Sequence, residues 1–260
     1  KGRPVARVPS RAEAGLPETG TVFCNFNNAY KLTPATFDSW MRILKAVDDS
    51  VLWLLESPAP YADNLRKEAA QRGIAPERLI FAPELDTDLH LARLSLADLF
   101  LDTFPFNGGV TTSDALWQGL PVLTRSGRSF ASRMSGSLLQ AADLPELVTH
   151  SLADYQALAI ALAQDPERLR ALRQRLQLHA VATGLASVVP QQRPPLERPR
   201  STRLQKPQRV VQHHVLHPQP EKVHHQPVFG RDRRLGQVDA QRRGYTALPD
   251  FVGAQLLHGV

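Results

Sequence analysis

Short apolar runs alternate with amphipathic stretches along most of the chain, from about residue 21 to residue 178. The run 51-VLWLLE-56 is almost continuously apolar, which is typical of a strand buried on both faces of a parallel sheet. The segment 34-PATFDSWMRILKAV-47 instead places apolar residues at three- and four-residue spacing after a proline, which predicts a helix. The same criteria predict strands at residues 21–26, 51–56, 79–83, 98–103 and 121–124, and helices at residues 34–47, 61–73, 87–94 and 111–119 and near residues 129–140, 151–164 and 166–178.

Strands that alternate with helices in this way predict an α/β fold with a doubly wound, parallel, Rossmann-like sheet. In such sheets, ligands bind beyond the carboxyl ends of the strands. Polar residues that directly follow a predicted strand are therefore the first candidates for a functional site.

The alternation stops near Leu178, and residues 190–237 are rich in proline, glutamine, arginine and histidine without a period of 2 or 3.6. Six of the nine histidines and nine of the 21 prolines lie beyond residue 182. Such a segment cannot bury enough apolar surface to offset the entropy of ordering, which predicts disorder. We therefore predict a linker at residues 1–18, a folded lobe at residues 19–180 and a disordered tail at residues 181–260.

Charge is distributed unevenly between these parts. The chain has a net charge of +6, but residues 1–182 hold 19 basic and 20 acidic side chains, whereas residues 183–260 hold 12 and 5. Because the lobe is close to neutral, we do not infer a nucleic-acid partner from the basic composition. Three interpretations of the tail stay open: a nucleic-acid-binding segment, a metal-binding segment rich in histidine, and an out-of-frame translation, which we favour.

Composition also bounds the cellular setting. The single cysteine, Cys24, cannot form a disulfide within the chain, which favours a reducing, cytoplasmic compartment. No apolar run approaches the ~20 residues of a membrane span, and the first residues lack the apolar core of a signal peptide. The sequence does not begin with Met, so we expect a fragment of a longer protein.

Two short polar groups are candidates for ligand binding. Asn27, Asn28 and Lys31 follow the first strand, where a lysine can reach a phosphate; the alternative is a solvated loop lysine. His90 and Arg93 lie three residues apart, and hence on one helical face, where they could frame a base or a diphosphate. The alternative for this second pair is a solvent-facing polar stripe.

The segment 102-DTFPFNGGVTTSDALWQGLPV-122 is the most informative in the chain. Gly108 and Gly109 allow a tight turn close to a ligand, and the helix that follows offers the free N–H groups of an anion site. Thr111 and Thr112 add hydroxyl donors, and Asp114 can accept from a sugar hydroxyl. The alternative, with Thr112 as helix N-cap and Asp114 as a first-turn acid, leaves the glycine pair unexplained.

Three long parts of the chain resemble one known family. They are similar to the C-terminal catalytic lobe of the O-linked N-acetylglucosamine transferase/SPINDLY family, glycosyltransferase family 41. Several ordered segments are more specific than one short motif, and the resemblance covers roughly residues 10–178. The segments are 22-VFCNFNNAYKLTPATFDSWMRILKAVDDSVLWLLE-56, 97-ADLFLDTFPFNGGVTTSDALWQGLPVLT-124, and 128-RSFASRMSGSLL-139 with 143-DLPELV-148.

The resemblance implies an inverting, metal-independent GT-B glycosyltransferase of two Rossmann-like lobes, with the donor sugar nucleotide held mainly by the C-terminal lobe. It implies no cofactor besides this donor. By position, Lys31 matches the lysine that binds the diphosphate, and Thr111 falls at a phosphate-binding threonine. Asn28 falls where the transferase branch usually has glutamine.

The same resemblance implies a nucleoside side of the site. His90 and Arg93 match positions near the base and ribose, and Asp114 matches the carboxylate that holds the ribose. The implied partners are a protein acceptor, an N-terminal catalytic lobe and tetratricopeptide repeats, the last two absent from this sequence. Separately from the resemblance, we expect no membrane partner and infer no nucleic-acid partner.

Two details bear on the identity of the donor. The loop 107-NGGVTT-112 has Gly109 and Val110 where the transferase branch usually has histidine and threonine. With Asn27-Asn28, this form looks more like the SPINDLY branch, some members of which use GDP-fucose. UDP-GlcNAc is the first expectation and GDP-fucose the alternative. Two further hypotheses are a lobe that binds the sugar nucleotide without transferring it, and a non-enzymatic basic interaction protein.

Overall fold

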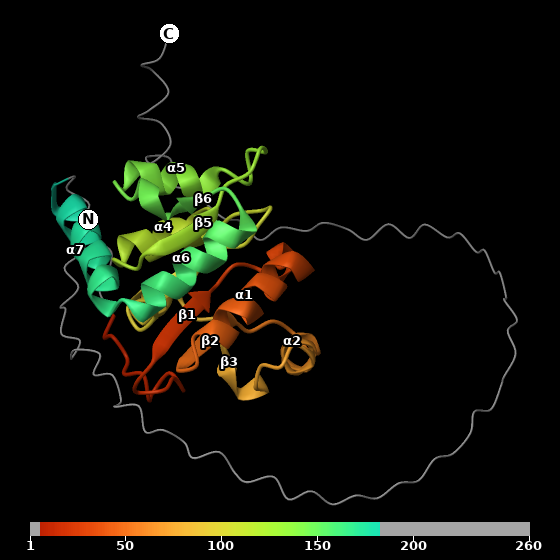
Figure 1. The fold of residues 1–260 in the computed structure, drawn as a ribbon. Coiled ribbons are helices and arrows are strands. Elements are labelled where there is room, and N and C mark those ends of the chain that lie inside the picture. Colours follow the sequence, from red (N-terminus) through yellow and green to blue (C-terminus); the bar gives the residue numbers. More distant parts are fainter. Residues whose placement is uncertain (1–5, 183–260) are drawn as a thin grey trace, which may run out of the picture. The chain divides into compact units, whose positions relative to one another are not determined.

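The computed structural model describes residues 6–182 (Figure 1). We predicted disorder, a frameshift, nucleic-acid binding or metal binding for the tail at residues 181–260. Of that tail, only residues 181 and 182, at the end of the last helix, belong to the described range, so these predictions lie outside it. The strands are β1 (Thr21–Asn25), β2 (Ser50–Leu55), β3 (Leu79–Ala82), β4 (Leu99–Leu101), β5 (Val122–Arg125) and β6 (Val148–Thr149). The α-helices are α1 (Pro34–Ala46), α2 (Tyr61–Gln71), α3 (Thr87–Leu94), α4 (Val110–Trp117), α5 (Met134–Ala141), α6 (Leu152–Gln164) and α7 (Pro166–Ala182), and the 3-10 turns are η1 (Ala29–Lys31), η2 (Pro76–Arg78) and η3 (Pro145–Leu147).

The six strands form one parallel sheet in the order β3-β2-β1-β4-β5-β6. Phe23 of β1 pairs with Leu52 of β2 on one side and Leu99 of β4 on the other, so β1 lies in the middle of the sheet. The prediction of a parallel, doubly wound α/β fold is therefore confirmed. This strand order reverses direction between β1 and β4, which is where doubly wound sheets hold their ligands.

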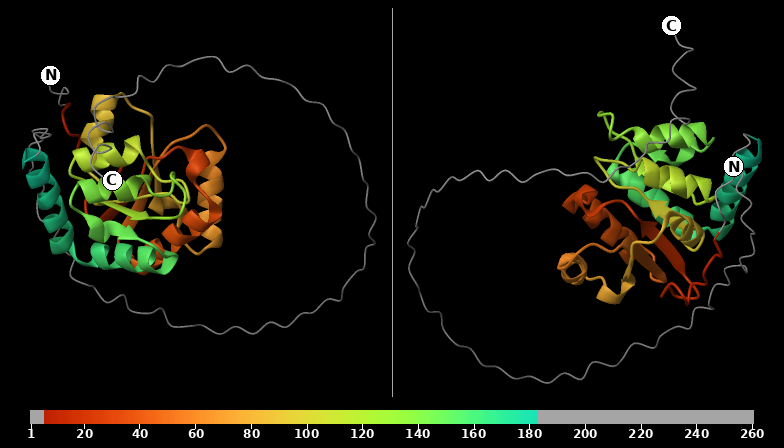
Figure 2. Two further views of the ribbon diagram at one scale, coloured as in Figure 1. Left: turned by 90° about the horizontal axis from the view of Figure 1, so that it is seen from above. Right: turned by 180° about the vertical axis from the view of Figure 1, so that it is seen from behind.

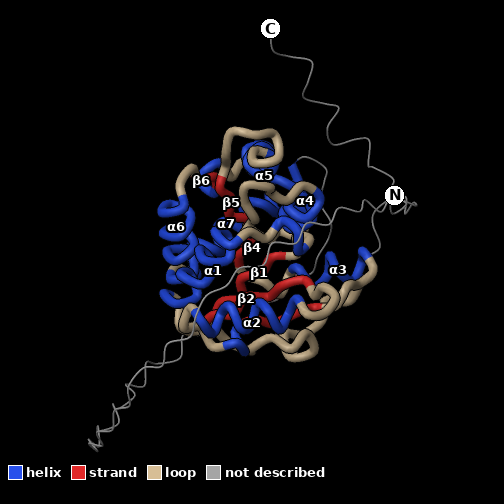
Figure 3. Tube along the Cα trace, turned by 90° about the vertical axis from the view of Figure 1, so that its right-hand side faces the viewer, coloured by secondary structure: helices blue, strands red, loops and turns tan. Residues whose placement is uncertain are grey.

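Helices cover both faces of the sheet. Figure 3 shows α1 and α6 on one side and α3 and α4 on the other. Figure 2 shows α7, in teal, turning away from the end of α6; only Asp165 separates the two helices. Because parallel strands need a crossover connection, α1, α3 and α4 each begin after the carboxyl end of one strand and return the chain to the start of the next.

A buried hydrogen-bonded chain links the two covering helices to the end of β4. The Trp40 indole N–H of α1 donates to the Tyr155 hydroxyl of α6 at 3.1 Å. The same hydroxyl donates to the main-chain oxygen of Asp102 at 3.0 Å. Trp40 and Tyr155 are at most 1% exposed. Breaking one of these hydrogen bonds would leave a buried polar group without a partner, which costs free energy. The two hydrogen bonds therefore fix the position of Asp102 as well as the packing of α1 on α6.

The structure differs from the sequence prediction in three places. Strand β6 was not predicted, because two residues are too few to give a period. The helix expected from residue 129 begins only at Met134, since Ser129 and Ser132 bond to each other in a preceding turn. Residues 8–16, expected as part of a linker, pack on the lobe: Leu16 is buried and Arg11 forms an ion pair with Asp98 at 2.7 Å.

Candidate functional site

The candidate site lies where the loops after β1 and β4 separate at the carboxyl edge of the sheet. From β1 the chain leads to η1 and α1 and then to β2 on one side. From β4 it leads through residues 102–109 to α4 and then to β5 on the other side. Doubly wound sheets bind their ligands between two such loops, in the crevice at the switch point. Lys31, Gly108, Gly109 and Thr111, all predicted from the sequence, lie on or directly after these loops.

Asp102 organises the loop after β4. One carboxylate oxygen accepts from the main-chain N–H of Thr103 at 2.9 Å and of Gly108 at 2.8 Å. The other accepts from the Thr124 hydroxyl at 2.7 Å. Asp102 is fully buried, which raises its pKa, while the donors from Thr124 and Gly108 act in the opposite direction. The carboxyl group thus closes the loop between residues 102 and 108.

Asn27 joins the loop after β1 to the loop after β4. Its side-chain N–H donates to Asp102 at 3.2 Å and to the Thr103 hydroxyl at 2.8 Å. Its side-chain oxygen accepts from the Thr111 hydroxyl at the start of α4. Because Asn27 is buried, these bonds fix the spacing between the two sides of the crevice.

Helix α4 begins at the crevice with Gly109 as its N-cap and no side chain capping it. The first N–H bonded within the helix is that of Ser113, to Gly109 O at 2.9 Å, so the amides of the first turn have no partner inside the helix. Such amides, together with the helix dipole, favour anions. The alternative from the sequence is wrong in both parts: Thr112 is not the N-cap, and Asp114 does not lie in the first turn.

Gly108 is required by the close approach of three side chains. A Cβ atom at this position would lie 2.5 Å from the Thr112 hydroxyl oxygen, 2.7 Å from that of Thr111 and 3.1 Å from Asn27 Oδ1. A Cβ atom at Gly109 would lie 3.7 Å from its nearest neighbour, the Cγ of Met134, which is an ordinary van der Waals contact. Only the first glycine of the pair therefore has to be glycine for steric reasons.

Lys31 ends η1 and reaches across the crevice to the loop after β4. Its ammonium donates to the main-chain oxygen of Asn107 at 2.9 Å and lies 4.2 Å from the centre of the Phe106 ring. The side chain is half-buried. The alternative of a solvated loop lysine is therefore wrong, and the structure brings Lys31 to the loop that also carries Gly108.

His90 and Arg93 contact each other on α3, as their spacing predicts. The guanidinium donates to His90 Nδ1 at 2.8 Å and to Pro83 O at 2.6 Å, and Arg93 is only 3% exposed, so the alternative of a solvent-facing stripe is wrong. Arginine has no acceptor, so the His90 ring carries its proton on Nε2. Burial, and then the charge of Arg93, lowers the pKa of His90 to about 4.

Phe26 connects this pair to the crevice. The centres of the Phe26 and His90 rings lie 5.3 Å apart in an edge-on arrangement. The Arg93 guanidinium carbon lies 4.6 Å from the centre of the Phe26 ring. Because Phe26 directly precedes Asn27, the pair lies beside the loop after β1. His90 is half-buried between Phe26 and Arg93, and Arg93 is buried beneath it.

The remaining predicted residues differ in their exposure. Asn28 is exposed, Asp114 is half-buried in α4, and Thr112 is buried with its hydroxyl 2.8 Å from that of Ser135. Sequence reasoning missed Asp102 and Asn107 as site residues. An acid directly after the apolar run 98-DLFLDT-103 was the available signal for the first. For Asn107, a buried side chain whose Oδ1 has no hydrogen-bond partner within the described residues, the signal was its place as the first residue of the loop 107-NGGVTT-112.

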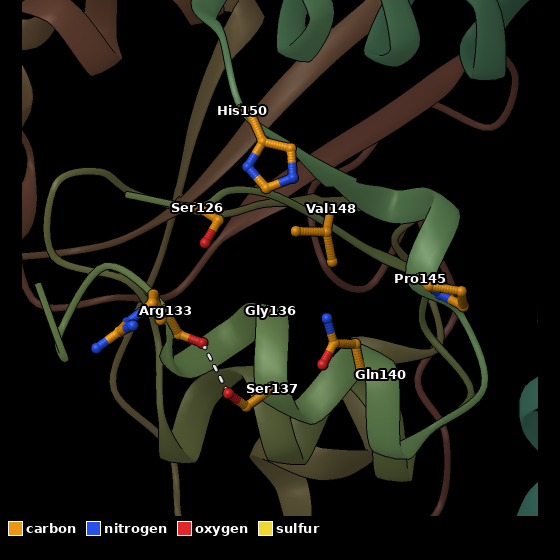
Figure 4. A pocket seen from close by; sticks show the side chains of 8 residues that line it. All are labelled: Ser126, Arg133, Gly136, Ser137, Gln140, Pro145, Val148 and His150. Atoms are coloured by element: carbon orange, nitrogen blue, oxygen red, sulfur yellow. Dashed lines mark hydrogen bonds between the residues drawn. The ribbon is translucent and has the colours of Figure 1, made fainter. Parts of the chain in front are cut away.

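A separate cavity of about 240 Å³ lies between α5 and the last two strands (Figure 4). Ser126, Arg133, Gln140 and His150 are among the residues that line it. In Figure 4 the Gln140 amide and the His150 ring extend toward this space from opposite sides. None of the predicted site residues lines the cavity.

Two features are absent from residues 6–182, the part of the chain that the structure describes. No group of three or more histidine, cysteine, aspartate or glutamate side chains in this range could hold a metal ion. Within the same range, no helix has the length and apolar character needed to cross a membrane.

The fold is similar to the Rossmann-like lobes of GT-B-type glycosyltransferases. The C-terminal domain of a group 1 glycosyl transferase from Francisella tularensis superposes with a TM-score of 0.51 over 69% of this chain and 95% of that domain, at 9% identity, which shows the fold alone. A mutant O-GlcNAc transferase from Thermobaculum terrenum superposes with a TM-score of 0.62 and 32% identity, over 64% of this chain and 33% of that one.

Sequence comparison identifies the family. The sequence profile of glycosyl transferase family 41 matches residues 4–190, and the chain belongs to this family. The UDP-N-acetylglucosamine–peptide N-acetylglucosaminyltransferase of Caenorhabditis elegans is 38% identical over 181 residues, 70% of this chain and 16% of that protein. The probable UDP-N-acetylglucosamine–peptide N-acetylglucosaminyltransferase SPINDLY of Petunia hybrida is 37% identical over 180 residues, which are 67% of this chain and 19% of that protein. The chain thus spans less than a fifth of the length of these two relatives.

The two glycines give a matched stability test. We expect Gly108→Ala to lower the free energy of unfolding by about 1–3 kcal/mol, because its methyl group forces the hydroxyls of Thr111 and Thr112 to move. Gly109→Ala has room and should change it by less than about 1 kcal/mol. Urea denaturation of both variants measures the difference. Equal losses would contradict the steric role assigned to Gly108.

His90 gives a pH test. A histidine whose pKa is lowered on folding contributes stability above its unfolded pKa, and this contribution is lost as the pH falls through the folded value, about 4. Allowing for the partial exposure of the ring, we expect the unfolding free energy to fall by about 1 kcal/mol between pH 7 and pH 5. His90→Gln, which keeps an acceptor for Arg93, should remove this part of the slope. An identical slope in the two proteins would show that His90 does not titrate on unfolding.

Proposed function

We propose that this chain is the donor-binding lobe of a protein O-glycosyltransferase that transfers N-acetylglucosamine from UDP-GlcNAc to serine or threonine of a protein. The observation that carries the proposal is the convergence of the Lys31 ammonium, the first turn of α4 and Gly108 at the β1/β4 switch point. Membership of family 41 and the names of the relatives support the choice of donor and acceptor.

The chemistry follows from where charge develops. As the bond from the anomeric carbon to the diphosphate oxygen breaks, its electron pair passes to the departing diphosphate. A lysine ammonium and helix N–H groups at that position stabilise the new charge without a metal ion. The Thr111 hydroxyl, whose one proton is donated to Asn27, holds the start of α4 in place. The acceptor hydroxyl attacks from the opposite face, which inverts the anomeric centre. In this proposal its proton passes to a group outside this lobe.

The nucleoside half of the donor lies, in this proposal, on the α3 and α4 side of the crevice. Asp114 accepts hydrogen bonds from the ribose hydroxyls. His90 stays neutral near pH 7 because burial and Arg93 lower its pKa to about 4, so its ring can stack on a base without the cost of a buried charge. Arg93 fixes the orientation of this ring through Nδ1.

One observation favours a second donor, GDP-fucose. Gly109 has no side chain and Val110 is 76% exposed at the start of α4, so neither supplies the histidine and threonine side chains expected for the transferase branch. The similarity to SPINDLY proteins is close to that for the other relatives. A lobe that binds a sugar nucleotide without transferring it is the third possibility. Comparing turnover by this chain with turnover by the full-length gene product distinguishes it from the other two.

Binding of the donor to this chain tests the proposal. We expect UDP-GlcNAc to bind, and Lys31→Met and Asp114→Asn each to weaken binding by about 10- to 100-fold, since each removes a charge-assisted hydrogen bond. Lys45→Met, which removes an exposed lysine from the last turn of α1, is the matched control and should leave affinity unchanged. Titration calorimetry with UDP-GlcNAc and GDP-fucose in parallel gives the affinities.

The outcomes separate the hypotheses. Tighter binding of GDP-fucose than of UDP-GlcNAc would assign the chain to the second donor. If the folded protein binds neither sugar nucleotide, the proposed function is wrong. If Lys31→Met behaves like Lys45→Met, the donor diphosphate does not lie where we propose.

A further inference from the structure

Two neighbouring residues of η1 reach across the crevice to the same aromatic ring. The Lys31 ammonium lies 4.2 Å from the centre of the Phe106 ring. The Tyr30 ring centre lies 6.2 Å from that of Phe106, with the two ring planes at 60°. Phe106 belongs to the loop after β4, so this contact joins the loops on the two sides of the switch point.

We propose that Phe106 is a positioning residue that holds the Lys31 ammonium at the diphosphate position. This inference rests on the proposed function and adds a residue that acts through Lys31 instead of contacting the donor. The face of an aromatic ring carries negative charge density, which attracts an ammonium within about 6 Å of the ring centre.

The number of donors on the ammonium explains why a ring is useful here. A lysine has three N–H donors on a flexible four-carbon stem, and without support it extends into water. One N–H donor of Lys31 bonds to Asn107 O at 2.9 Å. The Phe106 ring attracts the ammonium through its charge and provides no conventional hydrogen-bond acceptor atom. The ammonium is thereby held at the loop that leads into α4, while donor capacity is left for a diphosphate.

The exposure of Phe106 separates this role from ordinary core packing. Phe104, two residues earlier, is 2% exposed and stacks edge-on with Tyr155 at 5.4 Å, as a core residue does. Phe106 is 44% exposed and Tyr30 is 71% exposed. Replacing Phe106 with leucine therefore removes less buried surface than the same change at Phe104, and its effect on stability should be smaller.

A pair of substitutions at one position tests the proposal. Phe106→Leu keeps an apolar side chain but removes the ring, whereas Phe106→Tyr keeps the ring. We expect Phe106→Leu to weaken UDP binding by about fivefold, in line with a partly exposed cation–π contact. Phe106→Tyr, which keeps the ring, should bind UDP as tightly as the wild type. Uridine, which lacks the diphosphate, should bind equally to all three proteins. Titration calorimetry measures both ligands, and thermal unfolding checks that the variants are folded.

A double-mutant cycle and an NMR measurement complete the experiment. If Phe106 acts through Lys31, Phe106→Leu should have no further effect in the Lys31→Met protein. Without any ligand, the Lys31 ε-methylene protons should show an upfield ring-current shift that disappears in Phe106→Leu. This second measurement establishes the contact independently of nucleotide binding.

Each outcome is decisive. Loss of the ring-current shift with unchanged UDP affinity overturns the positioning role and leaves the proposed function standing. Equal weakening of UDP and uridine, equal loss in the leucine and tyrosine variants, or full additivity with Lys31→Met also overturns it. If the wild-type chain binds no nucleotide while the ring-current shift is present, the proposed function fails, and the positioning role fails with it.

Discussion

The buried carboxyl group of Asp102 is the constraint on which the site depends. It receives main-chain N–H groups from Thr103 and Gly108 and the hydroxyl of Thr124, and Asn27 also donates to it from the neighbouring loop. A fully buried carboxyl is costly unless such donors surround it. The same bonds that satisfy it therefore fold the loop after β4 back on itself, which sets Gly108 against the start of α4 and brings Phe106 and Asn107 within reach of Lys31.

The positive character of the site is local and does not come from net charge. Residues 1–182 hold 19 basic and 20 acidic side chains, so the lobe has no strong overall field. The site instead combines one ammonium with the unpaired amides at the start of α4, whose dipole favours anions. Because these groups are held by Asn27, Asp102 and an aromatic ring, they are in place before a ligand arrives, which is the condition for electrostatic stabilisation of a leaving group.

Most of the fold could be predicted from sequence, because the buried strands of a parallel sheet are short apolar runs such as 51-VLWLLE-56. The glycine pair before α4 likewise indicated a close approach, which the surroundings of Gly108 explain. What could not be predicted depends on contacts distant in sequence. The bond from Asn27 to Asp102, the burial of Thr112 against Ser135 and the contact of Lys31 with Phe106 each join residues more than twenty positions apart. Strand β6 is too short for any period to reveal it.

The central claim is that a nucleoside diphosphate binds at the β1/β4 switch point with its phosphates between Lys31 and the start of α4. A crystal structure of this chain with UDP tests it most directly. We predict phosphate oxygens within hydrogen-bond distance of Lys31 Nζ and of main-chain N–H groups in the first turn of α4. A diphosphate bound elsewhere, for example in the cavity beside Arg133 and His150, would contradict the claim.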